Sequence, residues 1–355
     1  MSKLYTLGPV EMHPEILEMG SAQVPYFRNQ EFSDVMLDAS AKLMELAGCD
    51  ANDKLVVLTA SGTAGMEATV MNCFHANDNL LVIDGGSFGH RFVQLCQLHK
   101  IPHTPVEVPY GETLTEEMIV AAAGEGKYTG LLVNIHESGT GQHYDIDMLS
   151  AYCKKNDMYF VVDAISSFLC DALNFKEHGI DALILSSQKA LSLAPGLSFV
   201  ALSERMVEKV NGIESGIMYL DFKDHLKNME RGQTPFTPAV RLAIEWQRRV
   251  NILCEIGIDK IVADVEEIAL DFRSKLGALG LEYPSYPLSN AGTPVLFPEG
   301  NALVVYEALK NDYGYTVNPS GGELGKKLFR VAHMGNHTVA DNDLLLDAIK
   351  EIMNR

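Results

Sequence analysis

The sequence predicts an α/β protein with a mostly parallel central sheet and a smaller C-terminal α+β domain. Two observations carry this prediction. Up to about residue 250, short apolar runs alternate with helical stretches, and this alternation is typical of βαβ units. Beyond Asn251 the alternation stops, and a long helical stretch over 258–279 leads into short strands and helices that end at Arg355.

The expected strands are apolar runs that suit a sheet buried on both faces. In chain order they span 54–59, 79–84, 130–136, 157–163, 181–187 and 196–202. Helical spacing of apolar residues follows at 61–75, 85–100 and 145–156. We expect three regions: an N-terminal arm over 1–15, a large domain over 16–250 and a small domain over 251–355.

Composition excludes several classes of protein. The chain has 355 residues, of which 47% are hydrophobic and 21% charged, an ordinary globular profile. No apolar run is long enough to span a membrane, and the start shows no secretory signal. Six scattered cysteines without a C-x-x-C pair favour a reduced, cytoplasmic protein with no zinc site. The net charge of -19 makes nucleic acid a poor partner.

Familiar motifs for phosphate, dinucleotide, zinc and acyl chemistry are absent. The sequence instead places polar groups where strands end, and ligands of α/β proteins bind at such ends. Lys189 follows the strand over 181–187, and Asp163 ends the strand over 157–163. On position alone, Lys189 could be an ordinary surface lysine and Asp163 an ordinary helix cap.

Two further groups lie at strand ends. Ser61, Gly62 and Thr63 stand between a strand and a helix, where backbone N–H groups and the helix dipole favour an anion. Ser61 or Thr63 could equally be a simple N-cap. Phe88 lies in an expected glycine-flanked loop and could stack on a flat ring or pack in the core.

Together, a lysine, an opposing aspartate, an anion-binding helix start and an aromatic ring suit pyridoxal phosphate. Lysine can bind its aldehyde covalently, the aspartate can keep its ring nitrogen protonated, and the helix start can hold its phosphate. We therefore expect pyridoxal 5'-phosphate as the cofactor.

The sequence resembles the class V aminotransferases, which are fold-type-I pyridoxal-phosphate enzymes. The resemblance runs from "LGPVEMHPEIL" through "FRNQEF", "TASGTAGMEA", "GSFGHRF", "HESGTGQ", "VVDAISS", "SSQKAL" and "QTPFTPAV" to "FRVAHMGN". Serine–pyruvate or alanine–glyoxylate aminotransferases and 2-aminoethylphosphonate–pyruvate aminotransferase are the most similar members.

The resemblance implies a role for each matching position. Lys189 would carry the cofactor, Asp163 would pair with the ring nitrogen, and Phe88 would stack on the ring. Arg330 would bind the acidic group of the substrate. Thr237 would reach the phosphate in the neighbouring subunit, so the resemblance implies a homodimer with shared sites. The phosphate of the chain's own cofactor would be held by Ser61, Gly62, Thr63 and Gln188.

Two positions depart from the family pattern. Gly139 stands where the family has a Ser or Thr near the ring hydroxyl, and Ser138 or Thr140 would have to replace that contact. We count Thr140 among the expected cofactor-binding residues. Phe27 stands where the family often has a His.

The expected activity is transfer of an amino group from a small amino acid, such as serine or alanine, to a small 2-oxo acid, pyruvate or glyoxylate. A 2-aminoethylphosphonate–pyruvate aminotransferase is the alternative. A cysteine desulfurase or another lyase would need a mobile cysteine after Lys189, and Cys254 lies in an expected helix. A regulator that binds the cofactor without turnover is the remaining alternative. The complete set of lysine, aspartate and arginine positions, Lys189, Asp163 and Arg330, argues against it. Without the resemblance, Arg330 could form a structural ion pair.

Overall fold

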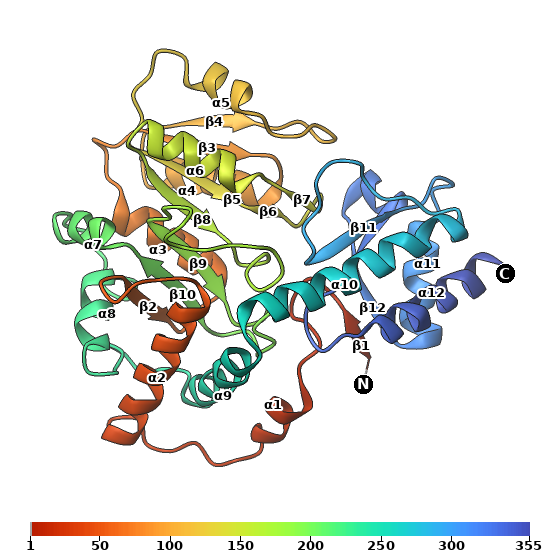
Figure 1. Ribbon diagram of the computed structural model, residues 1–355, viewed down its shortest axis with the longest axis horizontal. Helices are drawn as coiled ribbons and strands as arrows, with labels where there is room; N and C mark the ends of the chain where they lie inside the picture. Colours follow the sequence, from red (N-terminus) through yellow and green to blue (C-terminus); the bar gives the residue numbers. More distant parts are fainter. Residues whose placement is uncertain (1) are drawn as a thin grey trace.

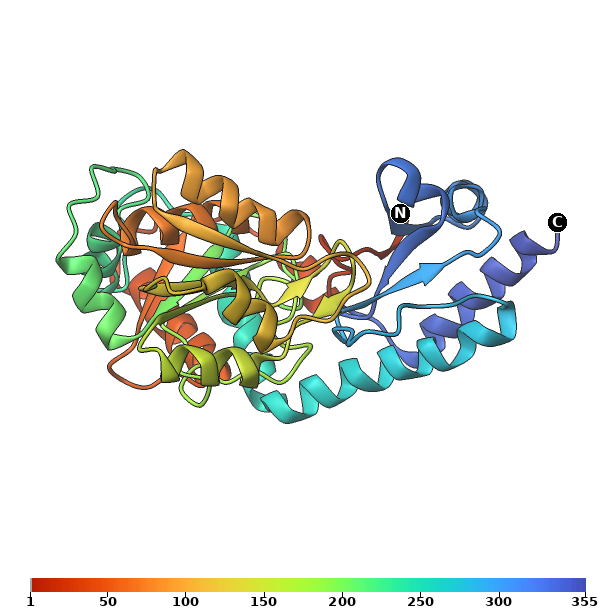
Figure 2. The ribbon, with the colours of Figure 1, turned by 90° about the horizontal axis from the view of Figure 1, so that it is seen from above.

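The fold consists of two sheets with helices around them (Figures 1 and 2). The structure is a computed structural model that describes residues 2–355, except the side chains of 322 and 323. The larger sheet has seven strands in the order β2-β10-β9-β8-β5-β3-β4, and the smaller has four in the order β1-β12-β13-β11. The predicted α/β class with a mostly parallel central sheet is confirmed.

The strands of the large sheet are parallel to their neighbours, except that β10 is antiparallel to both β9 and β2. They are β2 (Lys54–Leu58), β3 (Leu80–Asp84), β4 (His103–Glu107), β5 (Gly130–Asn134), β8 (Tyr159–Asp163), β9 (Ala182–Ser186) and β10 (Ser198–Leu202). Six of the seven lie in the expected runs. The exception is β4, which the sequence did not indicate.

The remaining strands are short. A two-stranded ribbon joins β6 (His136–Glu137) to β7 (Gln142–His143). The small sheet contains β1 (Lys3–Tyr5), β11 (Gly292–Leu296), β12 (Tyr315–Pro319) and β13 (Leu328–Ala332).

Helices cover both faces of the large sheet and one end of the small one (Figure 2). Around the large sheet lie α1 (Pro14–Met19), α2 (Gln30–Leu46), α3 (Gly62–Cys73), α4 (Ser87–Leu98), α5 (Glu116–Ala123), α6 (Ile146–Lys155), α7 (Glu204–Asn211), α8 (Phe222–Met229) and α9 (Val240–Ile256). With the small sheet go α10 (Ile258–Leu276), α11 (Ala302–Ala308) and α12 (Val339–Met353), and the short turns η1 (Gly277–Leu279), η2 (Leu309–Tyr313) and η3 (Gly322–Lys326).

Burial on both faces explains why the strands read as unbroken apolar runs. In β2, Leu55 and Val57 pack into the core cluster that contains Trp246 of α9. The alternate residues Val56 and Leu58 pack into the opposite cluster, with helix α3. Successive side chains of a strand point to opposite faces, so each strand contributes to two cores at once.

The N-terminal segment connects the two sheets. Strand β1 pairs with β12 of the small sheet, whereas Ile16 of α1 is buried in the core of the large one. At the other junction, Gly257 separates α9 from α10, so the expected domain boundary at residue 250 falls within α9. Helix α10 then runs from beside the large sheet to the small one (Figure 1).

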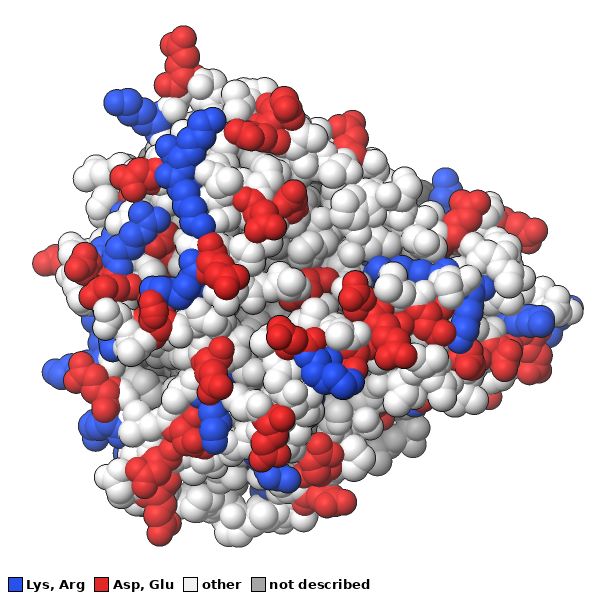
Figure 3. Space-filling view, viewed as in Figure 1, with Lys and Arg blue, Asp and Glu red and all other residues white. Residues whose placement is uncertain are grey.

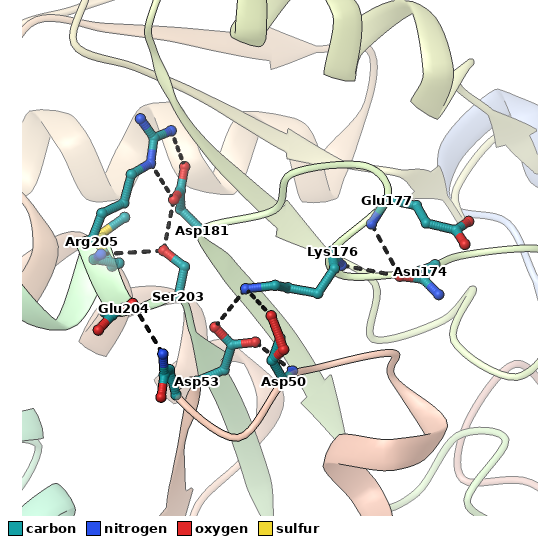
Figure 4. Close-up of polar contacts among 11 residues, drawn as sticks. Asp50, Asp53, Asn174, Lys176, Glu177, Asp181, Ser203, Glu204 and Arg205 are labelled. Atoms are coloured by element: carbon teal, nitrogen blue, oxygen red, sulfur yellow. Dashed lines mark hydrogen bonds and ion pairs between the residues drawn. The ribbon is translucent and has the colours of Figure 1, made fainter.

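A polar network ties strands together at the amino ends of β8 and β9 (Figure 4). Asp181 is buried, and its carboxylate accepts hydrogen bonds from Arg205 Nε at 2.6 Å, Ser203 Oγ at 2.7 Å and the Phe160 amide at 2.9 Å. These hydrogen bonds join the starts of β8 and β9 to the start of α7. The carboxyl ends of the same strands lie at the opposite edge.

Acidic side chains are spread over the face seen in Figure 3, including the area of α10. Among the described residues, no helix is both long enough and apolar enough to cross a membrane, and no group of His, Cys, Asp and Glu side chains could hold a metal ion.

Candidate functional site

A cavity of about 200 Å³ lies at the carboxyl ends of the large-sheet strands. Seven residues expected from the sequence line it: Ser61, Gly62, Thr63, Phe88, Asp163, Gln188 and Lys189. Ser138, one of the two possible replacements for the contact missing at Gly139, also lines it. Five lining residues were not expected from the sequence: Met66, Arg91, Asn134, Ile165 and Ser166.

Lys189 follows β9 and begins a tight turn. The turn is closed by the backbone carbonyl of Lys189, which accepts a hydrogen bond from the Ser192 amide at 2.7 Å. Its Nζ donates to the carbonyl of Leu7 in the N-terminal segment. Burial lowers the pKa of Lys189 to about 8, with Asp163 opposing and Arg330 reinforcing this change. Lys189 is therefore a buried amine with a substantial neutral fraction near neutral pH, unlike a solvated surface lysine.

Gly8 allows the N-terminal segment to lie directly against Lys189. Its φ is +129°, and a Cβ there would come within 2.7 Å of Lys189 Cδ and Nζ. Only glycine fits both the conformation and the space. The side chain of Lys189 is thus enclosed by a segment that begins in the small sheet.

Asp163 ends β8 and is 1% exposed. Its Oδ1 accepts from the Ile165 amide and its Oδ2 from Asn134 Nδ2, each at 2.9 Å. Burial raises the pKa of Asp163 to about 6, although both hydrogen bonds and Lys189 act to lower it. A cation placed against this carboxylate would favour its ionised form.

The start of α3 provides the anion-binding end of the cavity. Ser61 occupies the N-cap position, but its side chain makes no capping hydrogen bond. A Cβ at Gly62 would lie 2.5 Å from Ile165 Cδ1, so a larger residue there would require the Ile165 side chain to move. Thr63 Oγ1 accepts from Arg91 Nη1 at 3.0 Å, so a guanidinium adds to the positive end of the helix dipole. These groups favour an anion such as a phosphate.

Gln188 stands beside the same end of the cavity, and its Oε1 accepts from Ser186 Oγ at 2.6 Å. This bond leaves the Nε2 donors of Gln188 for another acceptor.

Phe88 lies in the first turn of α4, not in the expected loop. The cause is Glu137 of β6, whose buried Oε2 accepts from the amides of Phe88 and Gly89 at 3.0 Å each. A carboxylate satisfies free N–H groups and the dipole at a helix start, so α4 begins at Ser87 and includes Phe88 in its first turn. The guanidinium of Arg91 stacks on the ring of Phe88, 4.8 Å from its centroid.

Around Gly139, the structure brings Ser138 but not Thr140 to the cavity. The hydroxyl of Thr140 donates to the Glu137 carbonyl at 3.2 Å and accepts from the Gln142 amide at 3.3 Å. Its hydroxyl therefore belongs to the turn between β6 and β7. Of the two proposed replacements for the contact missing at Gly139, Ser138 has the better position.

Thr237 does not line the cavity of its own chain, and its side chain is exposed. It lies in the segment before α9. Arg28 holds that segment by donating to the Thr234 carbonyl at 2.7 Å and to the Pro235 carbonyl at 3.2 Å. Phe27 contributes its carbonyl, which accepts from Gln233 Nε2 at 3.0 Å.

Arg330 lies on β13, at the junction of the two sheets. It donates to the carbonyls of Ser138 at 2.8 Å and Pro319 at 2.9 Å, and its buried Nε has no partner. Among the described side chains, no carboxylate forms an ion pair with Arg330. Burial lowers the pKa of Arg330, and Glu137 partly opposes this change.

The family model for class-V aminotransferases matches residues 21–283. The chain belongs to this family. It is a pyridoxal-phosphate-dependent aminotransferase, as the sequence indicates.

Similar proteins cover almost the whole chain. An uncharacterized aminotransferase of Methanocaldococcus jannaschii is 29% identical over 92% of this chain and 86% of its own length. The L-aspartate–glyoxylate aminotransferase of Paracoccus denitrificans is 28% identical over 81% of this chain and 75% of its own. The crystal structure of an aspartate aminotransferase from Thermus thermophilus superposes with a TM-score of 0.90 and 28% identity, covering 99% of each chain.

The cavity fits the cofactor of this family. Pyridoxal phosphate carries an anion, an aldehyde and a basic ring nitrogen, and the cavity offers the start of α3, the amine of Lys189 and the carboxylate of Asp163. In addition, the Ser61 hydroxyl makes no capping hydrogen bond, and the Arg91 guanidinium, which donates to Thr63, has no carboxylate partner among the described side chains. A phosphate is a suitable partner for both groups.

The pKa of Lys189 predicts how covalent attachment of the cofactor to the aminotransferase depends on pH. Attachment needs the neutral amine. With the pKa at about 8, the rate constant should rise about tenfold per pH unit below that value and level off above it. Stopped-flow absorbance of apoprotein mixed with pyridoxal phosphate measures this rate.

Lys189→Arg serves as the control and should show no attachment. A rate that still rises steeply above about pH 9.5 would mean that Lys189 has an ordinary lysine pKa.

Proposed function

We propose that this aminotransferase moves the amino group of a small amino acid, such as serine or alanine, to pyruvate or glyoxylate. The observation that carries the proposal is the convergence of Lys189, Asp163 and the start of α3 on one small cavity, with Arg330 at its edge. The relative from Paracoccus denitrificans, named for glyoxylate, supports a small 2-oxo acid as acceptor.

Lys189 and Asp163 have different roles in the proposed reaction. Pyridoxal phosphate supplies an aldehyde that takes up the amino group and a ring that accepts the electron pair left at Cα of the substrate. Asp163 holds a proton on the ring nitrogen by charge pairing in a site shielded from water. Lys189 Nζ would hold the aldehyde and, when free, would take the proton from Cα of the substrate and deliver it to the carbon of the former aldehyde. The lowered pKa of Lys189 suits both tasks.

Arg330 is proposed to bind the carboxylate of the substrate. A buried guanidinium without an acidic partner is costly, and an incoming carboxylate would relieve that cost. Because the Ser138 and Pro319 carbonyls already hold its Nη atoms in place, the guanidinium is presented in a fixed orientation. A fixed planar fork can bind a carboxylate through two parallel hydrogen bonds.

A matrix of amino donors and oxo acids tests the substrate class. Serine, alanine, aspartate and 2-aminoethylphosphonate should be tried against pyruvate, glyoxylate and 2-oxoglutarate. We expect the highest kcat/KM with serine or alanine and a two- or three-carbon oxo acid. Lys189→Ala should abolish both turnover and the visible absorbance of the bound cofactor, which excludes a contaminating activity.

A higher kcat/KM with 2-aminoethylphosphonate than with serine or alanine would favour the alternative function, a 2-aminoethylphosphonate–pyruvate aminotransferase. A loaded protein whose spectrum no donor changes would support a regulator without turnover.

Replacement of Arg330 by lysine tests its role in substrate binding. Arg330→Lys keeps the charge but loses the paired hydrogen bonds, so KM should rise for both the amino acid and the oxo acid. We expect a fall in kcat/KM that corresponds to a loss of about 2–4 kcal/mol of transition-state stabilisation. The spectrum of the bound cofactor should not change. Steady-state kinetics with both substrates varied provides the measurement.

Arg355→Lys is a matched control, because Arg355 is a surface arginine at the far end of the small domain. If Arg330→Lys instead loses cofactor at unchanged KM, Arg330 is structural.

We further propose a cytoplasmic homodimer in which Thr237 contacts the phosphate bound by the neighbouring subunit. Thr237 is exposed and lies outside the cavity of its own chain. Beside it, the rings of Tyr219 and Phe236 stack at 5.1 Å, and Met218 is 76% exposed. An exposed apolar patch of this kind favours contact with another protein surface. The six free cysteines agree with a reducing compartment.

Complementation between two inactive variants tests the shared site. Lys189→Ala and Thr237→Arg should each be inactive alone. In co-expressed hybrids, one of the two sites combines an intact Lys189 with an intact Thr237, so activity should return to up to about a quarter of the wild-type value. Absence of any recovery in hybrids whose formation is verified, or a fully active monomer in sedimentation, would contradict the shared site.

A further inference from the structure

Asn134 is the last residue of β5 and stands directly opposite Asp163, the last residue of β8. Both are almost fully buried, at 3% and 1% exposure. Asn134 Nδ2 donates to Asp163 Oδ2 at 2.9 Å. Among the described residues, it is the only side chain that donates a hydrogen bond to this carboxylate, because the other donor is the backbone amide of Ile165.

The orientation of the Asn134 amide is determined by this contact. A carboxylate only accepts hydrogen bonds, so the amide nitrogen, and not the oxygen, must face Asp163. Asn134 Oδ1 is then buried without a partner. A strand residue between Val133 and Ile135 has no need of a polar side chain for packing, and an unpaired buried oxygen is unfavourable. The amide therefore serves the carboxylate rather than the fold.

We infer that Asn134 is a positioning residue that keeps Asp163 ionised and turned toward the cavity. This inference rests on the proposed role of Asp163 as the partner of the ring nitrogen. Asn134 itself lines the cavity, so it holds Asp163 from the side on which the cofactor would lie.

The groups that face Asp163 show why the amide matters. Burial raises the pKa of Asp163, and Glu137 of β6 adds to this effect. Three groups oppose them: the Ile165 amide, Asn134 and the charge of Lys189 after β9. When Lys189 binds the cofactor covalently, its full ammonium charge is no longer available for this purpose. The two hydrogen bonds then remain, together with the ring nitrogen itself.

Two variants of Asn134 separate this role from a structural one. Asn134→Leu removes the donor, and Asn134→Asp keeps the shape but replaces the donor by an acidic group. Two carboxyl groups in contact cannot both be ionised. The affinity of the protein for pyridoxal phosphate should be measured by absorbance titration between about pH 5.5 and pH 8.5.

In the wild type, the affinity should fall at low pH as Asp163 becomes protonated. The midpoint of that fall should move upward by about one pH unit in Asn134→Leu and further in Asn134→Asp. At pH values below the wild-type midpoint, Asn134→Leu should bind the cofactor about tenfold more weakly than the wild type, and Asn134→Asp more weakly still. At high pH the affinities of Asn134→Leu and the wild type should converge.

Asn342→Asp is the matched control. Asn342 is also 3% exposed, and its Nδ2 also donates to a carboxylate at 2.9 Å, that of Asp271, in the small domain. This variant should leave the midpoint unchanged.

Equal midpoints for the wild type and both Asn134 variants would overturn the inference. A smaller shift of the midpoint in Asn134→Asp than in Asn134→Leu would also overturn it, because the shape of the side chain alone would then matter. A wild type that binds no cofactor at any pH would instead contradict the proposed role of the site as a whole.

Discussion

A carboxylate and an amine that are both withdrawn from water are the constraint on which this structure depends. Asp163 ends β8 and Lys189 follows the neighbouring strand β9, and burial disfavours the charged form of each. The surroundings offset this cost with backbone and amide hydrogen bonds to the carboxylate and a backbone carbonyl for the amine. Such an arrangement is poor for stability but useful for chemistry, since it places both groups near the point where they gain or lose protons at physiological pH.

The fold could be read from the sequence because its strands are buried on both faces. Six runs of apolar residues gave six strands of the large sheet. Strand β4 was missed since it pairs only with β3 and contains Pro105, a residue that edge strands tolerate. Strand β1 was missed because it has only three residues. Its pairing with β12 depends on contacts across nearly the whole chain, which no local pattern encodes.

The cavity residues that could be predicted are those at strand ends. The carboxyl ends of parallel strands meet at one edge, so Asp163, Lys189 and the start of α3 had to lie close together. Asn134 also ends a strand, and this rule could have identified it, but it is hidden in an apolar run. Thr140 could not be placed from sequence because its orientation depends on a tight turn. Phe88 was assigned to a loop since its helix begins on a carboxylate from a distant strand.

The pairing of β1 with β12 has a consequence for biosynthesis. Lys3–Tyr5 leaves the ribosome long before its partner strand, Tyr315–Pro319, is made. At ordinary translation rates, the first strand must wait roughly 15–60 s before it can pair. Leu7, whose carbonyl accepts from Lys189, lies just beyond this strand. The segment that covers the buried lysine therefore gains its pairing partner only after every strand of the large sheet has been made.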